Sequence, residues 1–113
     1  KDYILTVASS GRQENIVELL KQSGIEDLFS LILTNTATSK AEMIKKILHK
    51  FDKKTEASVM ITDTVGDIVT AKKAGLKTIA VTWGFHSAKL LESAKPDYLA
   101  NNFKILYKHL KAF

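Results

Sequence analysis

The sequence alternates short, mostly apolar runs with longer segments that are apolar on one side only. The apolar runs lie at residues 3–8, 28–33, 58–62, 78–82 and, more briefly, 96–99. Strands that are apolar on both faces are buried on both faces, and strands separated by helices pair in parallel. The pattern therefore predicts an α/β protein: a three-layer, Rossmann-like parallel sheet with helices on both faces.

The amphipathic segments carry signals for where helices begin and end. A helix is predicted over residues 13–23, with Gly24 at the position of a helix stop. Residues 39–42 (Ser-Lys-Ala-Glu) have the form of a capping box and open a second helix. The remaining helices are predicted over residues 66–74, closed by Gly75, around residues 90–91, and along the apolar stripe Phe103, Leu106, Tyr107, Leu110 and Phe113.

Length and composition limit the possible classes of protein. The 113 residues fit a single domain over 1–113, and the chain has no cysteine, which excludes disulfides, thiolate metal sites and a cysteine nucleophile. No apolar run approaches the roughly 20 residues needed to span a bilayer, and no signal peptide is visible. We therefore expect a cytoplasmic protein with no membrane partner.

The chain is basic, with 17 Lys and Arg against 12 Asp and Glu, a net charge of +5. The lysines are scattered over several predicted helices, with few aromatic residues between them. That distribution favours solvated helix faces over a nucleic-acid surface. We expect no nucleic-acid partner.

Polar residues occur where the predicted strands end. Ser9 and Ser10 follow the first strand, Lys40 opens the helix after the second, Asp63 ends the third, and Asp67 comes four residues later. In parallel sheets, ligands gather at the carboxyl ends of the strands. A hydroxyl, a cation and two carboxylates at one rim are suited to a phosphate group and Mg²⁺.

Each of these residues also has an ordinary structural explanation. Ser9 or Ser10 can cap a helix, Lys40 can be a solvated lysine, Asp63 can form an Asx turn, and Asp67 can cap a helix. Their combination and order are what favour a site. Neither a dinucleotide-binding G-x-G-x-x-G nor a phosphate-binding Walker A motif is present, and a response-regulator receiver domain would place its acidic residues before the hydroxyl and the lysine.

These motifs resemble, in order and spacing, those of the haloacid dehalogenase-like hydrolase superfamily. Residues 8–11 (Ala-Ser-Ser-Gly) are similar to its second motif, residues 39–42 to its third, and residues 59–68 (VMITDTVGDI) to its fourth, acidic motif. Residues 81–85 (Val-Thr-Trp-Gly-Phe) and 96–99 (Pro-Asp-Tyr-Leu) resemble the phosphoglycolate-phosphatase-like branch. The likeness covers nearly the whole chain.

The resemblance implies a role for each matched residue. Ser9 would donate its hydroxyl to a phosphoryl oxygen, with the backbone N–H of Ser10 nearby. Lys40 would bind the phosphoryl group and neutralise charge during catalysis. Asp63 and Asp67 would form the Mg²⁺ site, with Asp63 as direct ligand and Asp67 orienting a metal-bound water or Lys40. Outside these motif positions, Gly84 would let the backbone pass close to the site.

The sequence departs from the family pattern in three ways. Thr62 stands where the family usually has glycine, which is expected to crowd the site slightly. The nucleophilic D-x-D motif of the family's central strand has no match here, and the substrate-selecting cap is not recognisable.

These departures predict the C-terminal part of a phosphatase core, inactive alone. The parent enzyme would hydrolyse a small phosphorylated metabolite through an aspartyl-phosphate. A missing N-terminal segment or a second chain would supply the absent strand, unless the two flanking strands pair directly. The alternative is a non-catalytic module that binds phosphate or metal, or a protein partner, on the same fold.

Overall fold

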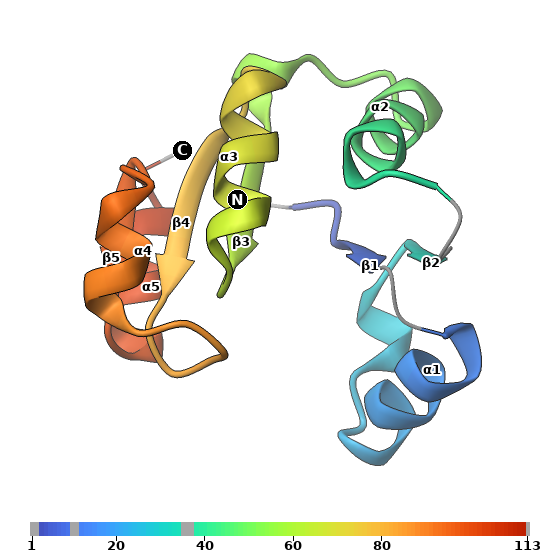
Figure 1. The fold of residues 1–113 in the computed structure, drawn as a ribbon. Helices are drawn as coiled ribbons and strands as arrows, with labels where there is room; N and C mark the ends of the chain where they lie inside the picture. The colour runs from blue at the N-terminus through green and yellow to red at the C-terminus, as the bar shows by residue number, and fades with distance from the viewer. Residues whose placement is uncertain (1–2, 10–11, 35–37, 113) are drawn as a thin grey trace. The chain divides into compact units, whose positions relative to one another are not determined.

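The computed structural model describes residues 3–9, 12–34 and 38–112, which belong to two compact units (Figure 1). The first unit spans Lys1–Phe51 and the second Asp52–Phe113. Both units contain parallel strands joined by helices, so the predicted α/β class is confirmed.

In the first unit, two strands and two helices alternate around a short 3₁₀ turn. Strand β1 (Thr6–Ser9) pairs in parallel with β2 (Leu31–Thr34), from Thr6 opposite Leu31 to Ser9 opposite Thr34. Helix α1 ends as predicted, because Gly24 adopts a φ of +72° and the N–H of Ile25 reaches back to the carbonyl of Leu20. The other elements are α1 (Gln13–Gln22), the 3₁₀ turn η1 (Glu26–Leu28) and α2 (Lys40–Lys50).

Both strands of this unit begin later than predicted. Residues 3–5 precede β1 and are more than two-fifths exposed, so apolar character alone did not mark a buried strand there. Leu28 lies in η1, 61% exposed, and its N–H bonds the carbonyl of Ile25. The N–H of Leu28 therefore makes a local hydrogen bond within a 3₁₀ turn and not a bond to a neighbouring strand. An apolar run in the sequence does not distinguish these two structures.

The second unit has a three-stranded parallel sheet in the order β3-β4-β5. Thr62 at the end of β3 lies opposite Ala80 of β4, and Val81 of β4 lies opposite Ala100 of β5. The elements are η2 (Thr55–Ala57), β3 (Val59–Thr62), α3 (Val65–Lys73), β4 (Lys77–Val81), α4 (Ala88–Ser93), β5 (Tyr98–Ala100) and α5 (Phe103–Leu110).

Helices cover both faces of this sheet. On one face, Ala80 packs with Ile68 of α3 and Leu91 of α4, and α3 lies over the β3–β4 ladder in Figure 1. On the other face, Ile79 and Val81 pack with residues of α5 such as Ile105 and Leu106. Alternate residues of the central strand are therefore buried on opposite sides, which confirms the layered arrangement predicted from wholly apolar strands.

Two boundaries of the second unit have local causes. Helix α3 is terminated by Gly75, two residues after its last residue: Gly75 has a φ of +86°, and the N–H of Leu76 bonds the carbonyl of Ala71, as predicted from the glycine. Strand β5 begins at Tyr98 rather than residue 96. Pro96 has no N–H, and the N–H of Asp97 donates to the Thr78 hydroxyl instead of extending the ladder.

Each sheet has an open edge in the described part of the chain. There, β1 pairs only with β2, and β3 pairs only with β4. An unpaired strand edge presents N–H and C=O groups to which another strand can bond.

Across residues 3–9, 12–34 and 38–112, no helix is both long and apolar enough to cross a bilayer.

Candidate active site

The two predicted metal-binding carboxylates lie in the turn between β3 and α3. Asp63 follows the last residue of β3, and Thr64 is the N-cap of α3. The Thr64 hydroxyl accepts the backbone N–H of Asp67 at 3.3 Å. Asp67 is therefore the third residue of the helix and not its cap, so its carboxylate has a different role from the capping one considered above.

Thr62 holds the Asp67 carboxylate. The Thr62 side chain is buried, and its hydroxyl donates to Oδ2 of Asp67 at 2.8 Å while accepting the N–H of Thr64 at 3.2 Å. The residue expected only to crowd the site thus makes a specific hydrogen bond to one of its carboxylates. The hydroxyl is satisfied as both donor and acceptor.

The loop after β4 holds Asp63. The N–H of Phe85 donates to Asp63 Oδ2 at 2.8 Å, and the N–H of His86 donates to the Asp63 carbonyl at 3.1 Å. A Cβ added at Gly84 would lie 2.2 Å from Asp63 Oδ2 and 2.3 Å from its Cβ. The backbone passes this close to Asp63 only because position 84 is glycine.

His86 and Trp83 in the same loop make structural contacts, the first a hydrogen bond and the second a ring contact. His86 Nδ1 accepts the N–H of Val65 at 3.0 Å, which satisfies a donor in the first turn of α3. The ring therefore caps the start of α3. Trp83 packs its ring 4.7 Å from that of Phe103 and is 43% exposed.

The donor chemistry of the β3–α3 turn fits Mg²⁺. Mg²⁺ is bound through oxygen, usually by one or two carboxylates together with phosphate oxygens and water. Asp63 and Asp67 supply two carboxylates within five residues. Within the described ranges no group of three or more acidic or histidine residues could hold a metal, so further ligands would come from phosphate or water, or from residues outside those ranges.

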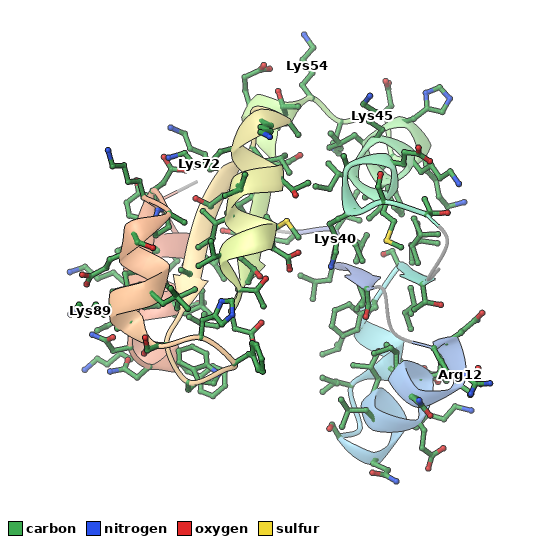
Figure 2. The ribbon with its side chains drawn as sticks, in the orientation of Figure 1. Arg12, Lys40, Lys45, Lys54, Lys72 and Lys89 are labelled. Carbon is green, nitrogen blue, oxygen red and sulfur yellow. The ribbon has the colours of Figure 1, made fainter. Side chains whose placement is uncertain are left out.

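The lysine predicted to bind phosphate lies in the first unit, at the end of β1. Lys40 is the first residue of α2, and its Nζ donates to the carbonyl of Ala8 at 2.9 Å. Figure 2 labels this side chain where it reaches from α2 to β1. Ser9 is the last residue of β1 and is half-buried, so a hydroxyl and an ammonium group are supplied at the carboxyl end of the same strand.

Ser39 fixes the start of the helix that carries Lys40. Its hydroxyl accepts the N–H of Glu42 at 3.2 Å, as the capping-box pattern predicts. We expect Ser39→Ala to lower the free energy of unfolding by about 1 kcal/mol, because one donor at the helix start loses its partner. Ser39→Asp, which also caps, is the control and should stay near wild type. Urea unfolding followed by circular dichroism measures both, and equal losses in the two variants would contradict the capping role.

The predicted site residues lie in different parts of the structure. Ser10 lies outside the described residues. Ser9 and Lys40 belong to one unit, and Asp63 and Asp67 to the other. That the two sets bind the same phosphate stays a prediction.

Sequence reasoning missed the contacts that orient the carboxylates. The spacing of Thr64 and Asp67 has the capping form, so that hydrogen bond was readable from the sequence. The bond from Phe85 to Asp63 spans 22 positions and has no local sequence signal.

Comparison with known proteins identifies relatives of this chain. The family model described as haloacid dehalogenase-like hydrolase matches residues 1–81. A phosphoglycolate phosphatase of Synechococcus elongatus is 31% identical over 96 residues, covering 84% of this chain and 45% of the relative. Pyrophosphatase PpaX of Bacillus mycoides is 29% identical over 108 residues, covering 92% and 50%.

A solved structure agrees with these relatives. The crystal structure of a predicted phosphatase from Clostridium acetobutylicum superimposes with a TM-score of 0.88 at 25% identity, covering 98% of this chain and 53% of that one. The chain therefore spans about half the length of the proteins it matches.

Proposed function

The chain belongs to the haloacid dehalogenase-like hydrolases, and we propose on that basis that it forms the C-terminal part of the core of a Mg²⁺-dependent phosphatase. The observation that carries the proposal is the β3–α3 turn, where Asp63 and Asp67 are each held by a specific donor. A turn built only to connect a strand to a helix does not need two oriented carboxylates. The relatives named as phosphatases support the same reaction class.

The proposed substrate is a small phosphate monoester. In the first step, a carboxylate oxygen of a nucleophilic aspartate bonds to phosphorus, the bond from phosphorus to the ester oxygen breaks, and the leaving alkoxide takes a proton from water or a general acid and departs as the alcohol. Water then hydrolyses the acyl phosphate and regenerates the aspartate. The family's D-x-D nucleophile motif has no match in this sequence, so we propose that the chain alone is inactive.

Residues of this chain would prepare the phosphoryl group for attack. We assign Ser9 to donate a hydrogen bond to a phosphoryl oxygen, together with the backbone N–H of Ser10. Lys40 would neutralise negative charge on the phosphoryl group. Asp63 and Asp67 would hold Mg²⁺, which supplies positive charge against the phosphoryl oxygens when bound.

The open strand edges are positions at which a strand bearing the nucleophile could pair. Both β1 and β3 have an edge at which a further strand can pair. We propose that a strand bearing the nucleophile occupies such an edge, from an N-terminal segment of the same protein or from a second chain. A cytoplasmic location and the lack of a nucleic-acid partner stay predictions.

The proposal is tested by comparing the 113-residue chain with the product of the full coding sequence. With p-nitrophenyl phosphate and Mg²⁺, we expect no turnover by the chain alone and clear turnover by the longer protein. Asp63→Asn in the longer protein should lower kcat by about 100-fold or more, because charge stabilisation by a metal ion contributes several kcal/mol.

Asp97→Asn is the matched control for this assay. Asp97 is also a hydrogen-bonded carboxylate of the second unit, but it accepts from Thr78 at the amino end of β4. It should leave kcat near wild type. Turnover by the 113-residue chain that Asp63→Asn abolishes would contradict its proposed inactivity. A longer protein that binds Mg²⁺ and phosphate without hydrolysis would favour the non-catalytic module.

A further inference from the structure

We infer that Thr62 is a positioning residue of the proposed metal site, and that its hydroxyl fixes the orientation of the Asp67 carboxylate. The inference rests on the proposed function, which gives Asp67 its role toward Mg²⁺. Thr62 stands where the resembled family usually has glycine, and the interaction depends on its side-chain hydroxyl. It was expected only to crowd the site.

The direction of the hydrogen bonds follows from the single proton of the hydroxyl. The backbone N–H of Thr64 points to Thr62 Oγ1 at 3.2 Å, so the oxygen is the acceptor of that bond. The proton of the hydroxyl is then directed to Asp67 Oδ2, 2.8 Å away. A hydroxyl that accepts a hydrogen bond is polarised and becomes a stronger donor.

The bonds form a closed ring around the start of α3. Asp67 is held at its carboxylate by Thr62 and at its backbone N–H by the hydroxyl of Thr64. Thr62 is only 6% exposed, so water competes little for its hydroxyl. Glycine at position 62 has no hydroxyl, so it would remove the hydrogen bond from Thr62 to the Asp67 carboxylate.

The same sheet contains a matched pair at the opposite ends of the strands. Thr78 is fully buried at the start of β4, accepts the N–H of Asp97 at 3.0 Å and donates to Asp97 Oδ2 at 3.2 Å. The two threonines thus make the same kinds of bond, a backbone amide to the hydroxyl and the hydroxyl to a carboxylate. Thr78 lies at the amino end of its strand, so it serves as a control for stability effects alone.

The test compares Thr62→Val, Thr62→Ser and Thr78→Val in the product of the full coding sequence, because metal ligands beyond Asp63 and Asp67 would come from outside the described residues. Mg²⁺ alone is titrated while backbone and aspartate resonances are followed by NMR. We expect Thr62→Val to weaken Mg²⁺ binding about 10- to 100-fold, the range typical for loss of a partner that orients a metal ligand. Thr62→Ser should restore binding to near wild type, and Thr78→Val should leave the dissociation constant unchanged.

A second readout does not depend on the metal. Three-bond couplings report the χ1 rotamers of Asp67 in the metal-free chain. We expect one dominant rotamer in the wild type and in Thr62→Ser, and averaging in Thr62→Val. If Thr62→Val does not fold, Thr62→Gly, which introduces the family's usual residue, takes its place in both measurements.

The two readouts separate failure of this inference from failure of the proposed function. Wild-type Mg²⁺ affinity and a single Asp67 rotamer in Thr62→Val would overturn the positioning role and leave the metal site standing. Absence of any Mg²⁺-dependent change at Asp63 or Asp67 in the wild type would overturn the metal site, and with it the role of Thr62 toward the metal.

Discussion

Replacing Ile68 with alanine is expected to lower the free energy of unfolding of the second unit by about 2–5 kcal/mol. Ile68 is fully buried and packs with Ala80 of the central strand and Leu91 of α4. Truncation leaves a cavity at the contact between α3 and the sheet. Because domains of this size are stabilised by only about 5–15 kcal/mol, this loss is a large part of the total stability, and the urea midpoint of the variant should fall clearly below that of the wild type.

Val69→Ala is the control for this substitution. Val69 is the next residue of the same helix but is 40% exposed, so the change in intrinsic helix propensity is similar while no cavity forms. We expect a change within about 0.5 kcal/mol. Urea unfolding followed by Trp83 fluorescence measures both variants, since Trp83 belongs to this unit. Equal effects of the two substitutions would contradict the assignment of Ile68 to the core.

Replacing Gly84 with alanine is expected to disturb the candidate site as well as the fold. The added Cβ would lie 2.2 Å from Asp63 Oδ2 and 2.3 Å from Asp63 Cβ, so the loop or the aspartate must move. Moving the end of a side chain does not relieve a contact with its Cβ. We expect a loss of about 1–3 kcal/mol of stability, and Mg²⁺ binding weakened by at least about tenfold because the Phe85 N–H no longer orients Asp63.

Gly66→Ala is the control for the effect of adding a methyl group to a glycine. Gly66 lies in the first turn of α3, and no atom lies within 4 Å of a Cβ built there. Alanine should be neutral or stabilising by up to about 1 kcal/mol, since glycine is the less favourable residue in a helix. Chemical unfolding and Mg²⁺ titration apply to both variants. A tolerated Gly84→Ala with wild-type Mg²⁺ affinity would contradict the close approach of the loop to Asp63.

Much of the secondary structure could be predicted because its causes are local. The cap at Ser39 and the helix stops at Gly24 and Gly75 depend on residues within about five positions of one another. The errors also have local causes. Leu28 is apolar but lies in a 3₁₀ turn, and Pro96 cannot donate the bond that would begin β5.

The residue types of the candidate site were also visible in the sequence, since Asp63, Asp67 and Lys40 follow strands in a recognisable order. The orientation of these side chains could not be predicted from the sequence. Thr62 looked like a minor steric departure, although its hydroxyl bonds Asp67, and Asp67 looked like a possible cap, although Thr64 takes that position. Which oxygen receives which proton depends on side-chain rotamers in the folded turn, and sequence spacing does not determine these.

The sequence by itself determined the alternation of strands and helices, the parallel class of the sheets, and the position of two carboxylates directly after a strand. These properties follow from periodicity and from the short reach of capping interactions. Tertiary structure alone decided that Phe85 and Gly84 meet Asp63, 21 or 22 residues away along the chain. The register that sets Thr62 opposite Ala80 brings the ends of β3 and β4 together, and hydrogen bonds between the segments that follow them form only once that pairing exists.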